Sequence, residues 1–313
     1  MTQDAEAVWV LADPRAGTAA QALGLAERLG RPFRVLPLEW GPLAALPMPW
    51  PSLAGLTPAA RALMVPPWPR LVISAGRRSA PVALWLGARG AKTVHAMRPG
   101  FGARSLDLMV VGQHDAVQPA ENVFPILGAM HRMSPDRLAT ARQDWAVLGD
   151  LPGPRIGLLL GGPVRGVGMA PGAAAALATQ AVAMGGSVLA STSRRTGDAA
   201  ARAVADSLAP HPHRLFAWGD PGANPYAGIL AWADAIIVSG DSVSMISEAL
   251  ATSAAIFIAP TGDAPRHARL AESLFAAGQA RPLVTGSPAV PRQPLDETGR
   301  VAAELTRRSM VPA

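Results

Sequence analysis

The feature that most constrains the fold is a regular alternation of short apolar runs with segments of helical spacing. In the first half, apolar runs stand at residues 7–12, 35–40, 71–75, 93–96, 106–112 and 122–127, with helical patterns at 18–29 and 79–88. Strands separated by helices predict a parallel sheet with right-handed crossovers. Eight prolines between residues 42 and 69 predict a surface loop there, with one short helix near 58–64.

The alternation begins again after a Gly- and Pro-rich stretch at residues 149–154. Strands are expected at 156–160, 187–191, 214–218, 235–239, 255–259 and 281–284, and helices at 171–184, 198–209, 226–233, 242–251, 266–277 and 295–308. We therefore predict two Rossmann-like, doubly wound α/β domains, residues 1–150 and 151–313, facing a crevice at the carboxyl ends of both sheets. The helix at 295–308 is a candidate to pack back on the first domain.

Composition narrows the class of protein. The 313 residues are 50% hydrophobic and include no Cys, which excludes a disordered chain, a disulfide scaffold and a Cys-ligated metal. No uninterrupted apolar run reaches about 18 residues and the first residues are polar, so we expect a cytoplasmic protein without a signal peptide. Peripheral contact with the inner membrane face stays open.

The net charge of +6 comes almost wholly from arginine, since Lys92 is the single lysine. The arginines are dispersed and no basic run has interleaved aromatics, so nucleic acid is not expected as a partner. The candidate partners that remain are a nucleotide sugar, another anionic acceptor, a membrane surface and a protein.

Two Arg-Arg pairs follow strands at equivalent places, Arg77-Arg78 in the first half and Arg194-Arg195 in the second. Arginine binds phosphate and carboxylate groups in a bidentate manner, so pairs that face the crevice would suit a phosphorylated ligand. The alternative is that each pair solvates a helix N-terminus or bridges to a carboxylate elsewhere.

Residues 240–250 form the most informative segment. Asp241 is expected to cap the helix, which leaves the amides from Ser242 to Ser244 near an incoming anion. Glu248 comes six residues after Ser242, which places it about 9 Å further along the helix axis at 1.5 Å per residue. That separation suits a diphosphate at the helix start and a ribose beside Glu248. A capped core helix with a structural glutamate is the alternative.

Two other signals are weaker. Residues 166–172 contain a loose G-x-G-x-x-x-G pattern, which with Arg194 and Arg195 could mimic a 2′-phosphate-binding NADP site. His211 and His213 have no further ligands near them in sequence, so no metal site is predicted.

Taken in order, these segments resemble the Elm-type mitochondrial-fission family. The resemblance is carried by residues 9–30, 72–80 (V-I-S-A-G-R-R-S-A), 107–115, 192–196 (T-S-R-R-T) and 224–248 (from N-P-Y to G-D-S-V-S-M-I-S-E). It implies a glycosyltransferase-B-like fold and a nucleoside-diphosphate sugar as substrate, with no cofactor required. Bacterial members are often labelled nucleoside-diphosphate-sugar epimerases, and the plant member acts as an adaptor that recruits a dynamin-related protein.

By this resemblance the second domain holds the nucleotide, and Glu248 binds its ribose. The residues near the diphosphate would be Gly161, Gly162, Ser193, Arg194, Arg195, Ser242 and Ser244.

The acceptor side would lie in the first domain, at Gly17, Thr18, Gln21, Arg77 and Arg78. The family commonly has a Gly-His pair followed by Asn-Gln after the first strand, whereas this chain has Thr18 at the histidine position. The remaining candidates for a catalytic base are His114, Asp115 and Asp13. The resemblance implies glycosyl transfer as the first hypothesis, and the Ser242–Glu248 face favours ligand binding. A sugar-nucleotide epimerase is a variant on the same fold, and the missing histidine favours the alternative of a non-catalytic adaptor.

Overall fold

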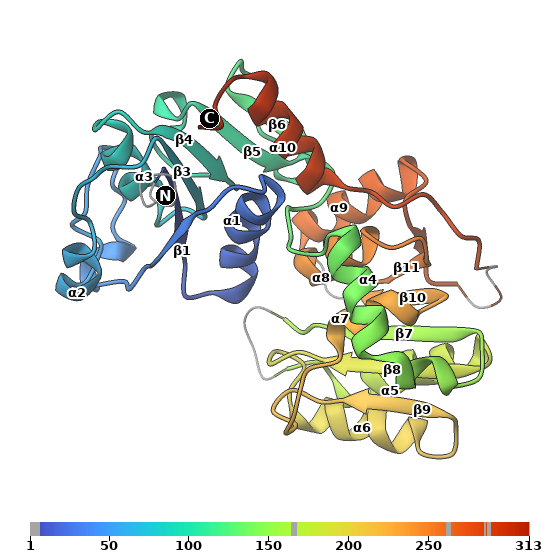
Figure 1. Cartoon of the computed structure of the whole chain (residues 1–313). Helices are drawn as coiled ribbons and strands as arrows, with labels where there is room; N and C mark the ends of the chain where they lie inside the picture. The colour runs from blue at the N-terminus through green and yellow to red at the C-terminus, as the bar shows by residue number, and fades with distance from the viewer. Residues whose placement is uncertain (1–6, 164–167, 261–263, 285, 287–288, 313) are drawn as a thin grey trace. The chain divides into compact units, whose positions relative to one another are not determined.

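The computed structural model describes residues 7–163, 168–260, 264–284, 286 and 289–312. Within these ranges the chain forms two compact units, one comprising Met1–Arg132 and Glu297–Ala313 and the other Met133–Asp296 (Figure 1). They are called unit 1 and unit 2 below. The polar N-terminal residues 1–6 and the first positions of the loose glycine pattern, Gly166 and Val167, lie outside the described residues.

Unit 1 is built on a six-stranded parallel sheet in the order β2-β1-β3-β4-β5-β6. Its strands are β1 (Val8–Ala12), β2 (Arg34–Pro37), β3 (Leu71–Ala75), β4 (Lys92–Ala96), β5 (Leu108–Gly112) and β6 (Val123–Ile126). Its helices are α1 (Ala16–Arg28), α2 (Pro58–Ala62), α3 (Ala80–Gly87) and α10 (Glu297–Arg307), with short 3-10 turns η2 (Pro42–Ala45), η3 (Ala103–Ser105) and η4 (Gln113–Asp115).

Apolar side chains cover both faces of this sheet, as a parallel sheet requires. Alternate residues of the strands pack with Leu25 of α1 and with Val301 and Leu305 of α10 in one core cluster. The other face, which includes Trp9, packs against α3 and the loops around α2. The last helix of the chain is thus part of the core of unit 1.

Unit 2 has a second six-stranded parallel sheet, in the order β12-β11-β10-β7-β8-β9. Its strands are β7 (Arg155–Leu160), β8 (Ser187–Thr192), β9 (His213–Phe216), β10 (Ala235–Ser239), β11 (Ala255–Ala259) and β12 (Arg281–Pro282). Its helices are α4 (Pro135–Asp144), α5 (Pro171–Ala183), α6 (Asp198–Leu208), α7 (Tyr226–Trp232), α8 (Val243–Leu250) and α9 (Pro265–Ala276), with a 3-10 turn η5 (Ala146–Asp150).

The predicted division after residue 150 differs from the observed one, which falls between Arg132 and Met133. Helix α4 was not predicted, although Ser134, Pro135 and Asp136 form a strong helix start: the Ser134 hydroxyl accepts a hydrogen bond from the Arg137 amide at 3.1 Å. The segment after α4 also belongs to unit 2, because a Cβ on Gly149 would lie 2.5 Å from the Trp232 ring. The two predicted parallel α/β sheets are confirmed.

A close helix–backbone contact in unit 1 gives a test of this packing. The backbone carbonyl oxygen of His131 lies 2.2 Å from where a Cβ on Gly24 of α1 would stand, so backbone would have to move to admit one. We expect Gly24→Ala to lower the free energy of unfolding by about 1–3 kcal/mol. Gly172 of α5 is a matched helical glycine with open space around it, and G172A should leave stability unchanged or slightly raised. Urea unfolding measures both; equal stability of the two variants would contradict the packing.

Candidate functional site

The site in unit 2 lies where the strand order of its sheet reverses. Numbered in chain order within unit 2, the strands from β9 to β12 have the order 3-2-1-4-5-6. The chain therefore adds strands on one side of β7 first and then on the other, so the order reverses between β7 and β10. In open α/β sheets of this order, ligands bind beyond the carboxyl ends of the strands at this switch point. The residues that follow β7, β8, β10 and β11 are therefore the ones to inspect.

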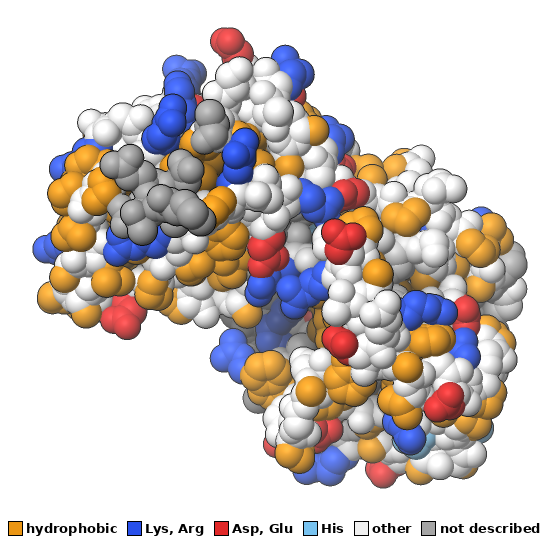
Figure 2. Space-filling model, viewed as in Figure 1, with side chains coloured by type: hydrophobic (Ala, Val, Ile, Leu, Met, Phe, Trp, Pro, Cys, Tyr) orange, Lys and Arg blue, Asp and Glu red, His pale blue; other side chains and the backbone are white. Residues whose placement is uncertain are grey.

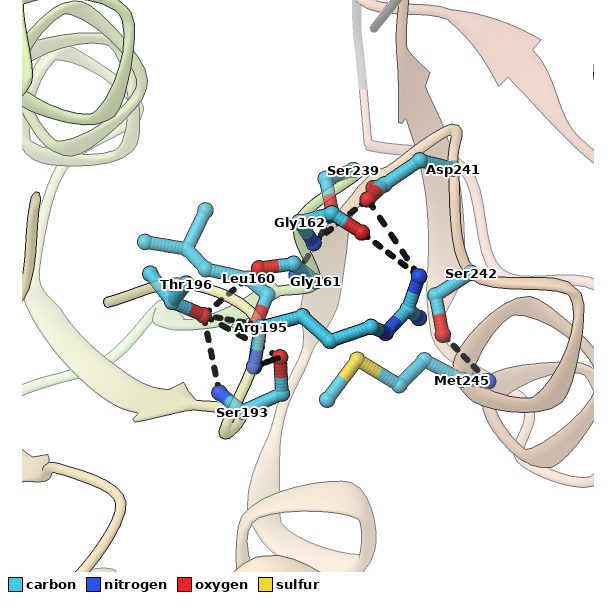
Figure 3. A network of polar contacts seen from close by, with 10 residues as sticks. All are labelled: Leu160, Gly161, Gly162, Ser193, Arg195, Thr196, Ser239, Asp241, Ser242 and Met245. Atoms are coloured by element: carbon cyan, nitrogen blue, oxygen red, sulfur yellow. Dashed lines mark hydrogen bonds and ion pairs between the residues drawn. The ribbon is translucent and has the colours of Figure 1, made fainter. Parts of the chain in front are cut away.

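The turn after β7 is fixed by two hydrogen bonds, which its amides donate to Ser239 of β10 and to Asp241 just beyond that strand. The Gly161 amide donates to Ser239 Oγ at 2.7 Å, and the Gly162 amide donates to Asp241 Oδ2 (Figure 3). A Cβ on Gly162 would lie 1.9 Å from the carbonyl oxygen of Arg195. Gly162 is thus required for close backbone packing, while a Cβ on Gly161 would crowd the Asp241 side chain at 2.8 Å. The amides of both glycines are already used within the protein.

The loop between β8 and α6 is held against the same turn by one buried hydroxyl. Thr196 Oγ1 lies 2.8 Å from the Leu160 carbonyl oxygen and 2.6 Å from that of Gly161, and it accepts a hydrogen bond from the Ser193 amide. The Arg195 amide donates to Ser193 Oγ at 3.2 Å. The conformation of the loop that carries Arg195 is therefore determined by its contacts with β7.

Arg195 lies between the turn and the start of α8, as Figure 3 shows. Its Nη1 donates to the Gly162 carbonyl oxygen at 2.5 Å and lies 3.9 Å from Asp241 Oδ2. Its neighbour Arg194 is exposed and has no ion-pair partner among the described residues. The structure thus separates the predicted pair into one anchored and one free guanidinium.

His267 joins this group and was not predicted. It stands in the first turn of α9, and its pKa is lowered by burial and by the charges of Arg266 and Arg195, while Asp241 raises it. The influence of Asp241 and Arg195 on its pKa makes His267 a further candidate residue of this site. The sequence signal was its position at the start of the helix that follows β11, the strand next to β10.

The predicted cap of α8 is wrong by one residue. Ser242, not Asp241, occupies the N-cap position, and its hydroxyl accepts a hydrogen bond from the Met245 amide at 3.5 Å. Asp241 instead accepts from Gly162, since that contact is available only once β7 and β10 are paired. Ser244 is half-buried in the first turn, where helix amides lack intrahelical partners.

Glu248 lies on α8 and forms a pair with Tyr226 of α7. The Tyr226 hydroxyl donates to Glu248 Oε2 at 2.7 Å. Burial raises the pKa of Glu248 to about 7, although the hydrogen bond from Tyr226 and the charge of Arg137 act in the opposite direction. This carboxyl group can therefore accept or hold a proton near neutral pH.

The corresponding edge of unit 1 lies after β1 and β3. Asp13 is buried and accepts hydrogen bonds from the Arg15 amide, from Arg15 Nε at 2.8 Å and from Trp40 Nε1 at 3.1 Å. Burial acts to raise the pKa of Asp13, but the hydrogen bonds from Arg15 outweigh it and hold the pKa below its ordinary value. Asp13 is thus an ionised anchor for Arg15, whose side chain is largely exposed.

The other two candidate bases stand in η4, after β5. His114 is 2% exposed, and its Nε2 lies 4.0 Å from Asp115 Oδ1. A Cβ on Gly112 would lie 2.1 Å from His114 Cε1, so the ring is packed directly on the end of β5. The pair is brought together as predicted, but its histidine is enclosed by protein.

The predicted acceptor-side residues fall into two groups. Thr18 and Gln21 are buried on the inner side of α1, where the Thr18 methyl group approaches Gly76, while Gly17 is exposed. Arg77 and Arg78 are exposed and line a pocket together with apolar side chains of the proline-rich loop.

Within the described ranges, no group of three or more His, Asp or Glu side chains is arranged to hold a metal ion. No helix in the described part of the chain is long and apolar enough to cross a membrane.

Solved structures show which class of fold this is. The chain is similar to Os79 from O. sativa in complex with UDP, with a TM-score of 0.55 at 12% identity over 96% of this chain and 91% of that one. It is similar to the UDP-GlcNAc 2-epimerase of Methanocaldococcus jannaschii in complex with UDP-GlcNAc and UDP, with a TM-score of 0.54 at 11% identity over 96% and 99%. The fold is of the glycosyltransferase-B type, as predicted.

The chain belongs to the mitochondrial fission ELM1 family, whose family model matches residues 16–309. A curated relative, the mitochondrial fission protein ELM1 of Arabidopsis thaliana, is 25% identical over 236 residues, which is 66% of this chain. The match spans 55% of the length of that relative. The resemblance read from the sequence is thereby confirmed.

The raised pKa of Glu248 gives a test of its environment. Between about pH 4.5 and 7 the folded protein keeps a proton that the unfolded chain has released, so this residue makes stability fall as the pH rises. Because the side chain is partly exposed, we expect a loss on the order of 1 kcal/mol between about pH 5 and 8. The loss should be absent in Glu248→Gln and unchanged in Glu272→Gln, an exposed control. Urea unfolding across this pH range provides the measurement, and identical slopes in all three proteins would contradict a raised pKa.

Proposed function

We propose that this protein binds a nucleoside-diphosphate sugar at the carboxyl edge of the unit 2 sheet and transfers the sugar to an acceptor held by unit 1. The observation that carries the proposal is the fixed position of Arg195 at the switch point, between the pinned β7 turn and the start of α8. A preorganised arginine beside a helix N-terminus is a favourable site for a phosphate group.

In this proposal the diphosphate is bound by side chains and by α8, and not by the glycine turn. Arg195 and Arg194 supply positive charge, Ser242 and Ser244 supply hydroxyls at the helix start, and His267 adds an imidazole. Gly161, Gly162 and Ser193 act indirectly, because their contacts hold the two loops in place.

The ribose would lie further along α8, beside Glu248. Tyr226 engages Oε2 of this side chain, so Oε1 remains to accept a hydrogen bond from a ribose hydroxyl. The hydrogen bond from Tyr226 also fixes the carboxyl group in one orientation, which reduces the entropy lost on binding.

The chemical step proposed is displacement of the nucleoside diphosphate from the sugar by an acceptor oxygen. The acceptor loses a proton to a base, and the diphosphate leaves with its negative charge stabilised by Arg195 and the helix N-terminus. No metal or other cofactor is assigned a role. Asp13, His114 and Asp115 stay the candidate bases.

A second candidate, a nucleotide-binding adaptor without transfer activity, is favoured by the state of those bases. Asp13 is saturated by Arg15 and Trp40, and His114 is buried. A sugar-nucleotide epimerase is a further variant, since the same fold is found in a UDP-GlcNAc 2-epimerase.

Nucleotide binding is tested by the thermal unfolding of the protein with uridine, guanosine, cytidine and thymidine diphosphates and with NADPH. A bound nucleoside diphosphate at 100 times its dissociation constant should stabilise the fold by about 2.7 kcal/mol. No stabilisation by any nucleotide would refute the proposal. Stabilisation by NADPH alone would indicate a dehydrogenase-type site instead.

The ribose assignment has its own test with two probes. Glu248→Gln should weaken the binding of a stabilising nucleoside diphosphate by about tenfold, which corresponds to one charged hydrogen bond. The affinity for inorganic pyrophosphate, which has no ribose, should be unaffected. Glu272→Gln is the matched control and should change neither affinity. Equal loss of both ligands in E248Q would show that Glu248 acts on the fold of the site, not on the ribose. Incubation of the protein with the corresponding sugar nucleotide then separates transfer or epimerisation from simple binding by the products formed.

A further inference from the structure

The positive charge of this protein is concentrated in one segment of unit 1. From Trp40 to Leu106 the chain contains no Asp or Glu. The basic residues in this stretch are Arg61, Arg70, Arg77, Arg78, Arg89, Lys92, Arg98 and Arg104. Eight positive charges without an acid, in a protein of net charge +6, mean that the remainder of the chain carries no net positive charge.

Large apolar side chains are exposed on the same segment. Trp50 is 60% exposed, Leu46 is 56% exposed and Phe101 is 55% exposed. They come from two loops that lie against each other, because a Cβ on Gly102 would lie 3.5 Å from the Pro49 carbonyl oxygen. Figure 2 shows hydrophobic side chains gathered over the α2 end of unit 1, with Lys and Arg side chains among them.

Arginines lie beside two of the three residues of this apolar patch, which we define as Leu46, Trp50 and Phe101. Arg77 and Arg78 line a pocket whose other walls include Leu46 and Phe101. Arg98 and Arg104 stand on either side of Phe101 in the connection from β4 to β5. All four arginines are exposed and have no ion-pair partner among the described residues.

We propose that this patch docks unit 1 on an anionic phospholipid bilayer, with the three apolar side chains inserted at the level of the headgroups and the four arginines against the lipid phosphates. Tryptophan and phenylalanine are favoured at that depth, and basic residues near an anionic surface are attracted to it. Arg70 and Lys92 lie at the opposite, amino edge of the sheet, and Lys92 pairs with Asp107, so only the four arginines near the patch are counted here. A bilayer offers anionic phosphates beside an apolar layer, which matches this combination of arginines and exposed apolar side chains better than a set of carboxylates alone would.

The test is flotation of the purified protein with lipid vesicles, without nucleotide, so that its outcome does not depend on the proposed function. We expect binding to vesicles of phosphatidylcholine with about one-third phosphatidylglycerol to be at least about tenfold stronger than to phosphatidylcholine alone. Added salt should weaken it, because screening reduces attraction between exposed charges.

Two double variants test the two components of the patch. Trp50→Ser with Phe101→Ser removes the inserting side chains, and Arg98→Gln with Arg104→Gln removes charge; each should weaken vesicle binding by about tenfold or more. Trp218→Ser, at a residue 62% exposed in unit 2, and Arg202→Gln with Arg214→Gln are the matched controls and should bind as the parent does. All sites are exposed, so melting temperatures should be unchanged; if the aromatic variant melts early, the arginine variant decides.

Three results of the vesicle experiments would overturn the proposal, and a fourth comes from a different probe. They are absence of flotation, equal binding to neutral vesicles, and patch variants that bind like the unit 2 controls. Binding of the protein to polyglutamate but not to anionic vesicles would also overturn it, and would assign the patch to an acidic protein partner.

Discussion

The arrangement of the unit 2 site depends on one close approach between two stretches of backbone. The turn after β7 lies so near the loop after β8 that Gly162 has no room for a Cβ beside the Arg195 carbonyl oxygen. This approach lets the Thr196 hydroxyl reach two carbonyl oxygens of the turn and lets the Arg195 guanidinium reach a third. The position of the arginine is thus determined by backbone contacts on both sides, which makes it a rigid element and not a mobile surface side chain.

The glycines of this turn therefore have a different role from those of a phosphate-binding loop. In a dinucleotide-binding motif, glycines let the backbone approach the pyrophosphate. Here the amides of Gly161 and Gly162 are consumed by Ser239 and Asp241, and the space that a side chain would need is filled by protein. In the proposed function, the diphosphate would therefore be bound by Arg195, His267 and the start of α8 and not by this turn.

Much of the fold could be predicted from the sequence, because apolar alternation reports burial on both faces of parallel strands. The site could be predicted less well, since its contacts join residues far apart in the chain. Asp241 is a residue type that often caps helices, but its carboxylate accepts a hydrogen bond from the Gly162 amide once β7 and β10 are paired. Helix α4 is a different case, because its start is local: the Ser-Pro-Asp sequence at residues 134–136 is itself a helix-start signal.

The sheet edges of the two units share an electrostatic arrangement that bears on chemistry. At the edge of unit 1, Asp13 is held by Arg15, and at the edge of unit 2, Asp241 accepts from Gly162 and lies near Arg195. In both cases the carboxylate lies beside an arginine and helps to position it. For Asp13 the hydrogen bonds from Arg15 also hold the pKa below its ordinary value, which makes this carboxylate a weak base. Binding of an anion and transfer of a sugar are therefore separate parts of the proposed function. The first draws on groups that the structure holds in place, whereas the second needs a base, and the candidate Asp13 already accepts hydrogen bonds from Arg15 and Trp40.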